Sequence, residues 1–406
     1  MNPPTRRAVL HATGLSGLTL IAGCLTGSNA VTDATDTGDD DACEVGRTLH
    51  TTDLDFPTTA AWPTYQYDAG NTGYNPDATG PASETVDVRW RYSACAETES
   101  GVAVRDGRVY TGGLVVDGRT GARNGGEWHG HMSTPTVTDE LVYVGVHNLE
   151  AREPQSGHLQ WTFETDGRAG GIPAPKVASG SLYVPGNIDD PTLYAIHAAD
   201  GSETWRYTTA DRVEAPVAVG DGMIFAVDES RTLYALDSET GEEVWTRAVA
   251  RAKSWRYPVV ADGHLYWGSR NGVTAHSITD GATIWEQSTV PGGAVAVADG
   301  SLYVAGEESL AALEPSTGQV QWQTTTPIID PGPPAVTDDV VCLAQTAGGS
   351  GSVIGLDSTT GEQQWHVETR GVQFGDYGSR GVPQALAIVD EYVFVATAAG
   401  DVYAIG

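Results

Sequence analysis

Short apolar runs separated by polar turns repeat along most of the chain. Within residues 215–249, the runs 216–219, 223–227, 232–236 and 243–247 alternate with turns that contain Asp, Ser or Gly. Each run has the length and the β-branched or aromatic content of a strand. The junctions favour tight turns, because Asp and Ser bond to backbone amides and Gly accepts a positive φ. This pattern predicts a unit of four short antiparallel strands.

The unit recurs with a period of about forty residues, which is typical of β-propeller blades. In each unit a glycine ends a polar turn and a tryptophan follows it closely. These glycines are Gly121, Gly157, Gly201, Gly241, Gly281, Gly318 and Gly361. A large aromatic side chain at one place per blade can fill the wedge between neighbouring sheets. The structural tryptophans predicted in this way are Trp90, Trp128, Trp161, Trp205, Trp245, Trp285, Trp322 and Trp365. A ligand-stacking platform is the alternative interpretation of the series.

The two ends of the repeat region complete each other. Runs 393–395 and 402–405 are followed by no glycine turn and no tryptophan, whereas 86–92 is a strand-like run with a tryptophan and no partner runs before it. Joining these ends in one blade closes the ring and hides sheet edges that would otherwise promote aggregation. The sequence therefore predicts an all-β, eight-bladed β-propeller with four-stranded antiparallel blades.

The first residues resemble an export signal. Arg6 and Arg7 precede an apolar stretch, 12–22, that is too short to cross a bilayer, which needs about twenty residues. The paired arginines resemble a twin-arginine (Tat) signal, and the residues up to Cys24 resemble a lipobox; an ordinary cleavage site beside a chance cysteine is the alternative. We expect a lipoprotein signal peptide over 1–23, a disordered acidic spacer over 24–59 and the propeller over 60–406. A lipid on Cys24 would hold the protein on the cell membrane, facing outside.

The charge balance argues against one class of partner. The chain has 22 basic and 53 acidic residues, for a net charge of −31. Nucleic-acid binding needs concentrated positive charge, so we expect no nucleic-acid partner. An acidic surface of this kind suits a halophilic protein that stays soluble in concentrated salt.

The cysteines and histidines offer few candidates for disulfides or metal sites. Export would permit a disulfide, and Cys43 with Cys95 is the pair to test, whereas Cys342 lies in an apolar run and is expected to be a buried thiol. His129 and His131 form an H-x-H pattern beside Glu127, but no third ligand is recognisable, so we predict no metal site. No catalytic triad or phosphate-binding loop stands out, and we predict no catalytic residues.

The run from Leu233 to Gly241, followed by Trp245, resembles the PQQ-like β-propeller repeat, and the segment 62–76 resembles the lead-in of that family. The resemblance implies two branches. One consists of quinoprotein dehydrogenases, which bind pyrroloquinoline quinone (PQQ) and calcium on the propeller axis. The other is non-catalytic and includes the propeller lipoprotein of the bacterial outer-membrane β-barrel assembly machine. The dehydrogenases are longer and typically contain adjacent cysteines, which this chain lacks, so the non-catalytic branch is favoured and no cofactor is predicted.

The strand order sorts charged residues onto two faces of the predicted ring. One face collects the D-x-x-T-G turns and is strongly acidic, while the other is nearer neutral and has arginine, aromatic and glycine-rich loops. We predict that this second face, around the central funnel, binds a protein partner or an anionic ligand; the alternative is that the D-x-x-T-G motif alone causes the asymmetry. The candidate residues are Arg168, Arg212, Arg231, Arg251, Lys253, Trp255, Arg256, Tyr257, Arg270, Arg370, Phe374, Tyr377 and Arg380.

The predicted function is therefore an exported, lipid-anchored, non-catalytic binding or scaffolding module. The alternative is a quinone- or metal-dependent oxidoreductase that uses the same funnel, with PQQ and calcium as its cofactors.

Overall fold

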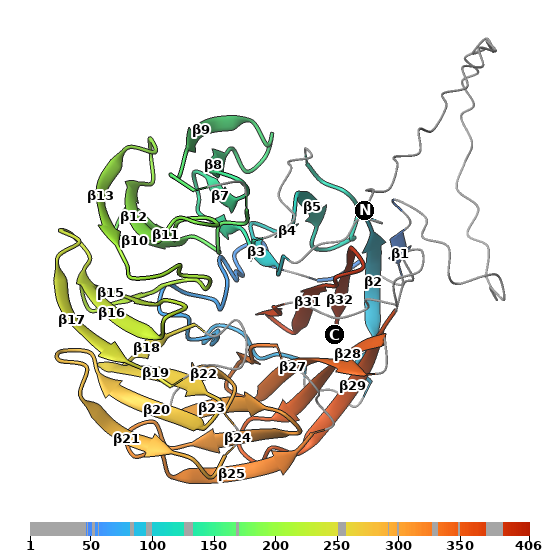
Figure 1. Ribbon diagram of the computed structural model, residues 1–406. Coiled ribbons are helices and arrows are strands. Elements are labelled where there is room, and N and C mark those ends of the chain that lie inside the picture. Colours follow the sequence, from blue (N-terminus) through green and yellow to red (C-terminus); the bar gives the residue numbers. More distant parts are fainter. Residues whose placement is uncertain are drawn as a thin grey trace, which may run out of the picture. The chain divides into compact units, whose positions relative to one another are not determined.

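A ring of antiparallel sheets makes up the compact unit Asp41–Gly406 in the computed structural model (Figure 1). Eight sheets form the ring, and this confirms the predicted all-β, eight-bladed propeller. The structure describes residues 46, 48–50, 53–55, 57–81, 85–94, 100–125, 133–167, 170–250, 257–290, 292–298, 300–326, 332–347, 350–370 and 385–406.

Six blades have four strands in sequence order, from the innermost to the outermost. The first three of these blades are β6 (Thr136–Val137), β7 (Val142–Gly145), β8 (Leu149–Arg152) and β9 (Leu159–Phe163); β10 (Lys176–Ala178), β11 (Ser181–Pro185), β12 (Thr192–His197) and β13 (Glu203–Thr208); and β14 (Ala218–Gly220), β15 (Met223–Val227), β16 (Thr232–Asp237) and β17 (Glu243–Ala248). The next three are β18 (Val259–Ala261), β19 (His264–Ser269), β20 (Gly272–Ser277) and β21 (Thr283–Gln287); β22 (Ala294–Ala298), β23 (Ser301–Gly306), β24 (Ser309–Leu313) and β25 (Val320–Thr325); and β26 (Ala335–Val336), β27 (Val340–Ala347), β28 (Ser350–Asp357) and β29 (Gln363–Thr369).

The other two blades depart from four strands. The sheet of β3 (Ala103–Arg105), β4 (Arg108–Thr111) and β5 (Leu114–Asp117) has three strands among the described residues, and Trp128 lies outside them. The closing sheet has five, because β1 (Thr48–His50) pairs with the outer edge of β2 (Val88–Ser93). Its other strands are β30 (Ala387–Val389), β31 (Tyr392–Ala396) and β32 (Asp401–Ile405).

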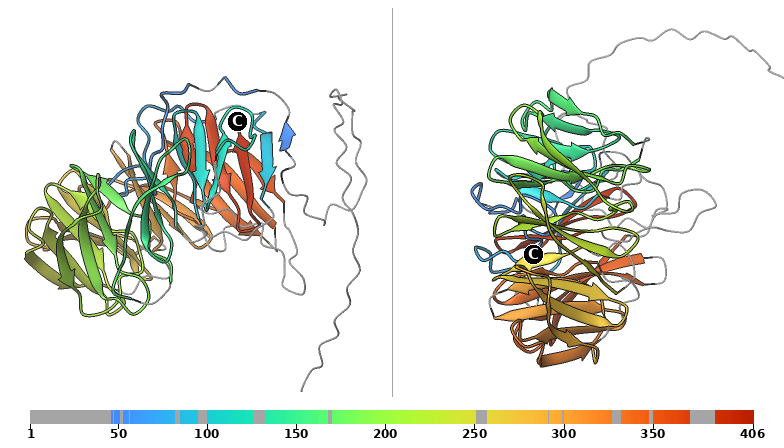
Figure 2. Two further views of the ribbon diagram at one scale, coloured as in Figure 1. Left: turned by 90° about the horizontal axis from the view of Figure 1, so that it is seen from above. Right: turned by 60° about the vertical axis from the view of Figure 1, so that its left-hand side comes forward.

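The closing sheet joins the two ends of the repeat region as predicted. Strand β2 pairs antiparallel with β32, with Trp90 opposite Ala404. The N-terminal strand thus supplies the outer position that the last half-unit lacks, and the ring closes through main-chain hydrogen bonds. Figure 2 shows the neighbouring sheets of this unit packed face to face.

Six tryptophans of the predicted series pack on the glycine turn of the next blade. Gly241 has a φ of 72°, and a methyl group added to it would come within 2.6 Å of the Trp205 ring. The Trp205 indole also donates a hydrogen bond to the carbonyl of Ser238 in the same turn, at 3.1 Å. The same Trp–Gly contact recurs at Trp90/Gly121, Trp161/Gly201, Trp245/Gly281, Trp285/Gly318 and Trp322/Gly361. These tryptophans therefore fill the spaces between blades.

The last tryptophan of this series, Trp365, has a different hydrogen-bond partner. At the junction with the closing blade, the Trp365 indole donates a hydrogen bond to the carbonyl of Pro81 at 2.6 Å. The aspartate that begins a D-x-x-T-G turn has the predicted role at Asp117, Asp237 and Asp357, where it accepts hydrogen bonds from the turn. In the blade of β14–β17, Asp237 Oδ1 accepts from the backbone N–H and the hydroxyl of Thr240, at 2.8 and 2.9 Å.

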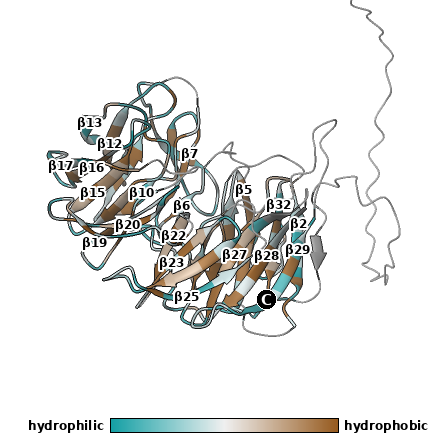
Figure 3. Cartoon of the chain, turned by 60° about the horizontal axis from the view of Figure 1, so that its bottom comes forward, coloured by the Kyte–Doolittle hydropathy of each residue, from teal (hydrophilic) through white to brown (hydrophobic). Residues whose placement is uncertain are grey.

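Apolar residues concentrate on the inner strands of each blade (Figure 3). The three central residues of β15 are buried, whereas Trp245 is the one buried residue of the outer strand β17. This gradient follows from position, because inner strands are covered on both faces by neighbouring blades and outer strands border solvent. Within the described residues, no helix has the length and apolar character needed to cross a membrane.

Candidate functional site

The ring has two faces, which are named here from the blade of β14–β17. The turn face carries the turns after the first and third strands, 221–222 and 238–241. The loop face carries the turn after the second strand, 228–231, and the described ends of the connection to the next blade, 249–250 and 257–258. Because every blade has the same strand order, equivalent turns lie on the same face all around the ring.

The lead-in segment, residues 60–80, crosses the centre of the ring, where Figure 1 shows it in blue. Its carbonyls accept hydrogen bonds from a backbone N–H on the innermost strand of six blades, at 2.7–2.9 Å. The donors are Val104, Val137, Val219, Val260, Val297 and Val336, and the acceptors, in the same order, are Trp62, Pro63, Ala69, Gly70, Thr72 and Gly73. Each valine lies close to the end of its strand at the turn face. The lead-in therefore covers the axis at the turn face and pairs inner edges that would otherwise be open.

The other two blades contact the lead-in through side chains. In the closing blade, Asn75 Nδ2 donates to the carbonyl of Ile388 at 2.8 Å. In the blade of β10–β13, the Lys176 ammonium donates to the carbonyls of Tyr65 and Asp68, the latter at 2.7 Å. Lys176 is fully buried. Burial lowers the pKa of Lys176 to about 7, against the opposing attraction of the Asp68 carboxylate.

Lys176 differs from its counterparts in the other blades. The strand register places small or β-branched residues at the same position: Ala103, Thr136, Ala218, Val259, Ala296, Ala335 and Ala387. The lysine thus extends inward in one blade alone, at the point where the lead-in bulges through residues 64–68.

This bulge has a strained backbone. Gln66 and Tyr67 have φ values of 54° and 69°, in the left-handed region that residues other than glycine rarely adopt. Gln66 is fully buried, and neither its carboxamide nitrogen nor its carboxamide oxygen has a hydrogen-bond partner among the residues described. Asn71, also at positive φ, is better placed, since its Nδ2 donates to the carbonyls of Val217 and Pro258, each at 3.0 Å.

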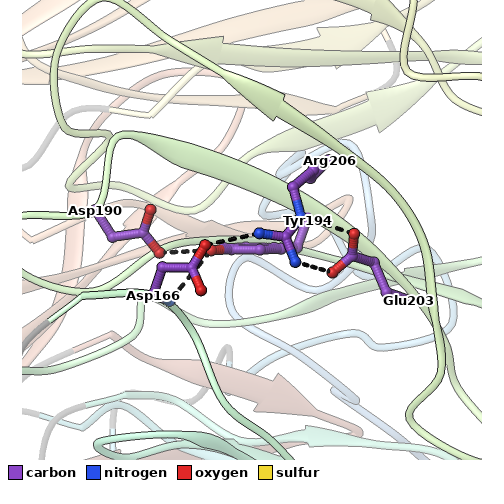
Figure 4. Close-up of polar contacts among 5 residues, drawn as sticks. All are labelled: Asp166, Asp190, Tyr194, Glu203 and Arg206. Carbon is purple, nitrogen blue, oxygen red and sulfur yellow. Dashed lines mark hydrogen bonds and ion pairs between the residues drawn. The ribbon is translucent and has the colours of Figure 1, made fainter.

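On the loop face, a tyrosine bonded to a carboxylate holds the loop from the preceding blade (Figure 4). The Tyr194 hydroxyl donates to Asp190 Oδ2 at 2.8 Å and accepts the backbone N–H of Asp166 at 3.3 Å. Arg206 lies over the Tyr194 ring and bonds to Asp166 at 2.7 Å and to both oxygens of Glu203. Burial, followed by the hydrogen bond to Asp190, raises the pKa of Tyr194 to about 12.

The arrangement recurs in two other blades. Tyr234 donates to Asp228 at 2.9 Å and accepts the N–H of Ala210 at 2.9 Å. Tyr403 donates to Asp401 at 3.3 Å and accepts the N–H of Arg370 at 3.0 Å. Burial is the main cause of a raised pKa in both tyrosines, so neither is suited to acid–base chemistry near neutral pH. These tyrosines fix loops between blades.

The predicted loop-face residues divide into groups. Arg231 and Arg270 are exposed and form no ion pair with the described part of the chain. Arg212 is paired with Glu214 and Glu229. Arg370 is bonded through two nitrogens to the fully buried carboxylate of Asp401, each at 3.1 Å. The charges of Arg212 and Arg370 are therefore largely neutralised within the chain.

Tyr257 lies in the core rather than on the loop face. It is 4% exposed, its hydroxyl donates to the carbonyl of Val295, and its ring meets Tyr65 of the lead-in edge to face. The other predicted loop-face residues lie outside the described residues: Arg168, Arg251, Lys253, Trp255, Arg256, Phe374, Tyr377 and Arg380.

The predictions about cysteines and metals are tested only in part. Cys342 is a buried free thiol, and burial raises its pKa. Cys24, Cys43 and Cys95 lie outside the described residues, as does the stretch from Glu127 to His131. Among the residues that the structure does describe, no group of three or more His, Cys, Asp or Glu side chains is placed to hold a metal.

Sequence reasoning missed both the lead-in contacts and the carboxylate-bonded tyrosines. One signal for the first was available: Lys176 is one of two lysines in the chain, and it stands in an apolar run. For the second, Tyr194 and Tyr234 occupy the same place in a Thr-Leu-Tyr-Ala motif, each a few residues after an aspartate. Neither signal identifies the partner backbone groups, which come from the lead-in for Lys176 and from the loop of the preceding blade for the tyrosines.

Known proteins similar to this chain fall into two groups. The chain is 29% identical over 175 residues to outer membrane protein assembly factor BamB of Yersinia pestis, covering 39% of this chain and 43% of that protein. It is 26% identical over 190 residues to quinohemoprotein alcohol dehydrogenase ADH-IIG of Pseudomonas putida, covering 41% of this chain and 26% of that enzyme. The matched region thus spans less than half the length of either relative.

A solved structure agrees on the fold. The quinohemoprotein alcohol dehydrogenase from Comamonas testosteroni has a TM-score of 0.69 at 15% identity, covering 87% of this chain and 81% of that chain. A family model matches residues 145–289 and 269–406, which together make up more than half of the chain. This chain therefore belongs to the PQQ_2 family, described as outer membrane protein assembly factor BamB.

Proposed function

We propose that the protein is an exported, lipid-anchored propeller that binds a protein partner or an anionic ligand through its loop face and is not itself catalytic. This proposal rests on a structural difference between the turn face and the loop face. The lead-in bonds to the inner strands beside the turn face, whereas the loop face presents Arg231 and Arg270 without ion-pair partners among the described residues. Arginine is enriched at protein interfaces, where its planar guanidinium makes several directed hydrogen bonds.

The family supports a role in binding other proteins, since its description and the Yersinia pestis relative both name an assembly factor. The chain covers less than half of that relative, so the identity of the partner is not carried over. The lipid on Cys24 and the acidic residues between it and β1 complete the proposal. They would let the propeller stand off the outer side of the cell membrane, with its loop face accessible. The predicted spacer 24–59 is too long at its C-terminal end, because β1 (Thr48–His50) pairs with β2 in the closing sheet and Leu54 is buried.

The alternative is an oxidoreductase, and the match to quinohemoprotein alcohol dehydrogenases favours it. The residues of this chain do not fit PQQ and calcium well. The cysteines, at 24, 43, 95 and 342, include no adjacent pair, and the described residues offer no cluster of acidic side chains for a calcium ion. No catalytic step is therefore derived through these groups.

Charge reversal on each face tests the proposal. Arg231→Glu, Arg270→Glu, Arg256→Glu and Arg380→Glu are combined on the loop face. The matched control, Glu239→Arg, changes an exposed charge on the turn face of the same blade as Arg231. After crosslinking on intact cells, the proposal predicts that the loop-face variant loses its main crosslinked protein, or its bound anionic ligand, while the control keeps it. Unchanged capture by the loop-face variant would contradict the proposal.

A further inference from the structure

Three features that each cost stability meet at one place on the propeller axis. Gln66 and Tyr67 have positive φ values, a backbone conformation that is unfavourable for residues other than glycine. Within the described part of the chain, the Gln66 carboxamide is buried without hydrogen-bond partners, and the buried Lys176 ammonium has no carboxylate among its hydrogen-bond acceptors. Buried polar groups and charges ordinarily have partners, because leaving water is unfavourable. Strained and unpaired groups persist only where the surrounding structure holds them in place, and they cluster at functional sites and switch regions.

We infer that residues 64–73 of the lead-in form a segment that covers the propeller axis and can be released from it. The protonation state of Lys176 controls whether this segment stays bound or is released. This inference concerns access to the axis from the turn face and is independent of any partner on the loop face. Release would break the Lys176 contacts and the bonds from Val219, Val260, Val297 and Val336. It would expose the inner strand edges of these blades and an ammonium group on the axis.

The surroundings of Lys176 define the pH range in which release responds. Among the described residues, Asp68 is the one charged group acting on it, and its carboxylate favours the protonated ammonium. The Lys176 ammonium lies over the Tyr65 ring, 5.7 Å from its centroid, and Tyr183 is the register partner of Lys176 on β11. The equivalent residues of the adjacent inner strands, Thr136 and Ala218, do not titrate.

The sign of the response follows from the two states of Lys176. In the closed state its pKa is about 7, whereas a solvated lysine has the ordinary value of 10.5. Between these values the open state binds one more proton than the closed state, so lower pH favours opening. The opening equilibrium should rise about tenfold for each unit that the pH falls between about 10 and 7, and level off below pH 7.

Limited proteolysis of the full-length protein measures this opening. Chymotrypsin cleaves after Tyr65 and Tyr67 only when the lead-in detaches from the inner strands, and mass spectrometry identifies the cleavage site. Rates at pH 7.5 and 9.5 are divided by those of a free peptide of residues 60–80, which removes the pH dependence of the protease. Cleavage after the buried Tyr234 reports global unfolding and serves as the internal reference.

The inference predicts that the normalised lead-in cleavage rate is about one hundred times higher at pH 7.5 than at 9.5, with no parallel rise after Tyr234. Lys176→Met should be slow at both pH values, whereas Lys253→Met, which removes the only other lysine, should behave like the parent protein. A flat or opposite pH response of the parent would overturn the inference. So would an unchanged response in Lys176→Met; should that variant not fold, the parent's pH series decides alone.

Discussion

Replacing Gly241 by Ala is expected to destabilise the ring more than the same change at Gly222. Both glycines have nearly the same backbone conformation, with φ values of 72° and 74°. A methyl group at Gly222 meets nothing within 4 Å, whereas at Gly241 it comes within 2.6 Å of the Trp205 ring. The pair therefore separates the cost of backbone conformation from the cost of packing between blades.

The magnitudes follow from these two contributions. Placing Ala at positive φ costs about 1–2 kcal/mol, and the stiffer unfolded chain returns about 0.4–1 kcal/mol of this in both variants. Crowding against a packed ring costs a further 1–3 kcal/mol, roughly. The unfolding free energy of Gly241→Ala should therefore lie about 1–3 kcal/mol below that of Gly222→Ala.

Urea denaturation of both variants and the parent, followed by far-ultraviolet circular dichroism, measures the difference. The comparison is of midpoints, at equal slopes, because a ring of this size need not unfold in two states. Trp205→Leu adds a second test, since the smaller side chain should make Gly241→Ala less costly than in the parent. Equal destabilisation by the two glycine variants, within about 0.5 kcal/mol, would refute the packing role of the tryptophans.

Three further predictions concern single side chains. Arg370→Met should lower the unfolding free energy by about 3–5 kcal/mol, because it leaves the buried Asp401 carboxylate without its main partner. Arg206→Met breaks exposed ion pairs and should lower the unfolding free energy by about 1 kcal/mol or less in the same denaturation assay. Equal losses of unfolding free energy in Arg370→Met and Arg206→Met would contradict this distinction. Cys342 should react with a thiol reagent at pH 8 only after unfolding, since its thiol is buried with a raised pKa, and rapid labelling of the native protein would contradict its placement. Burial is the main cause that lowers the pKa of His276 in the folded state, so the stability of the protein should fall as the pH drops below about 6.5. His276→Leu should remove this part of the acid sensitivity, measured by melting curves at several pH values. The same pH dependence in the variant and the parent would contradict this prediction.

The fold could be predicted because its signals lie in side chains at a fixed period. Gly241 and Trp245 belong to a motif that recurs in nearly every blade, and the glycine has the positive φ that the turn chemistry requires. Closure was predictable for the same reason, because the strand around Trp90 is the piece that the last half-unit lacks.

The axis could not be predicted in the same way. The lead-in is held by backbone N–H groups of valines such as Val219 and Val260, and valine in a strand carries no sign of such a bond. Tyr257 was predicted for the loop face because it ends a loop rich in arginine and aromatic residues. It is buried because the chain turns inward there to begin β18, where Tyr257 packs against Tyr65.

Purification of the protein from detergent-solubilised native membranes at high salt tests the central claim most directly. One half of the sample is analysed by mass spectrometry and the other by an absorption scan for a bound quinone. The account predicts a protein partner in stoichiometric amount, or a bound anionic ligand, with no quinone chromophore. A quinone spectrum, or redox activity restored by added quinone and calcium, would contradict it and identify the propeller as an enzyme.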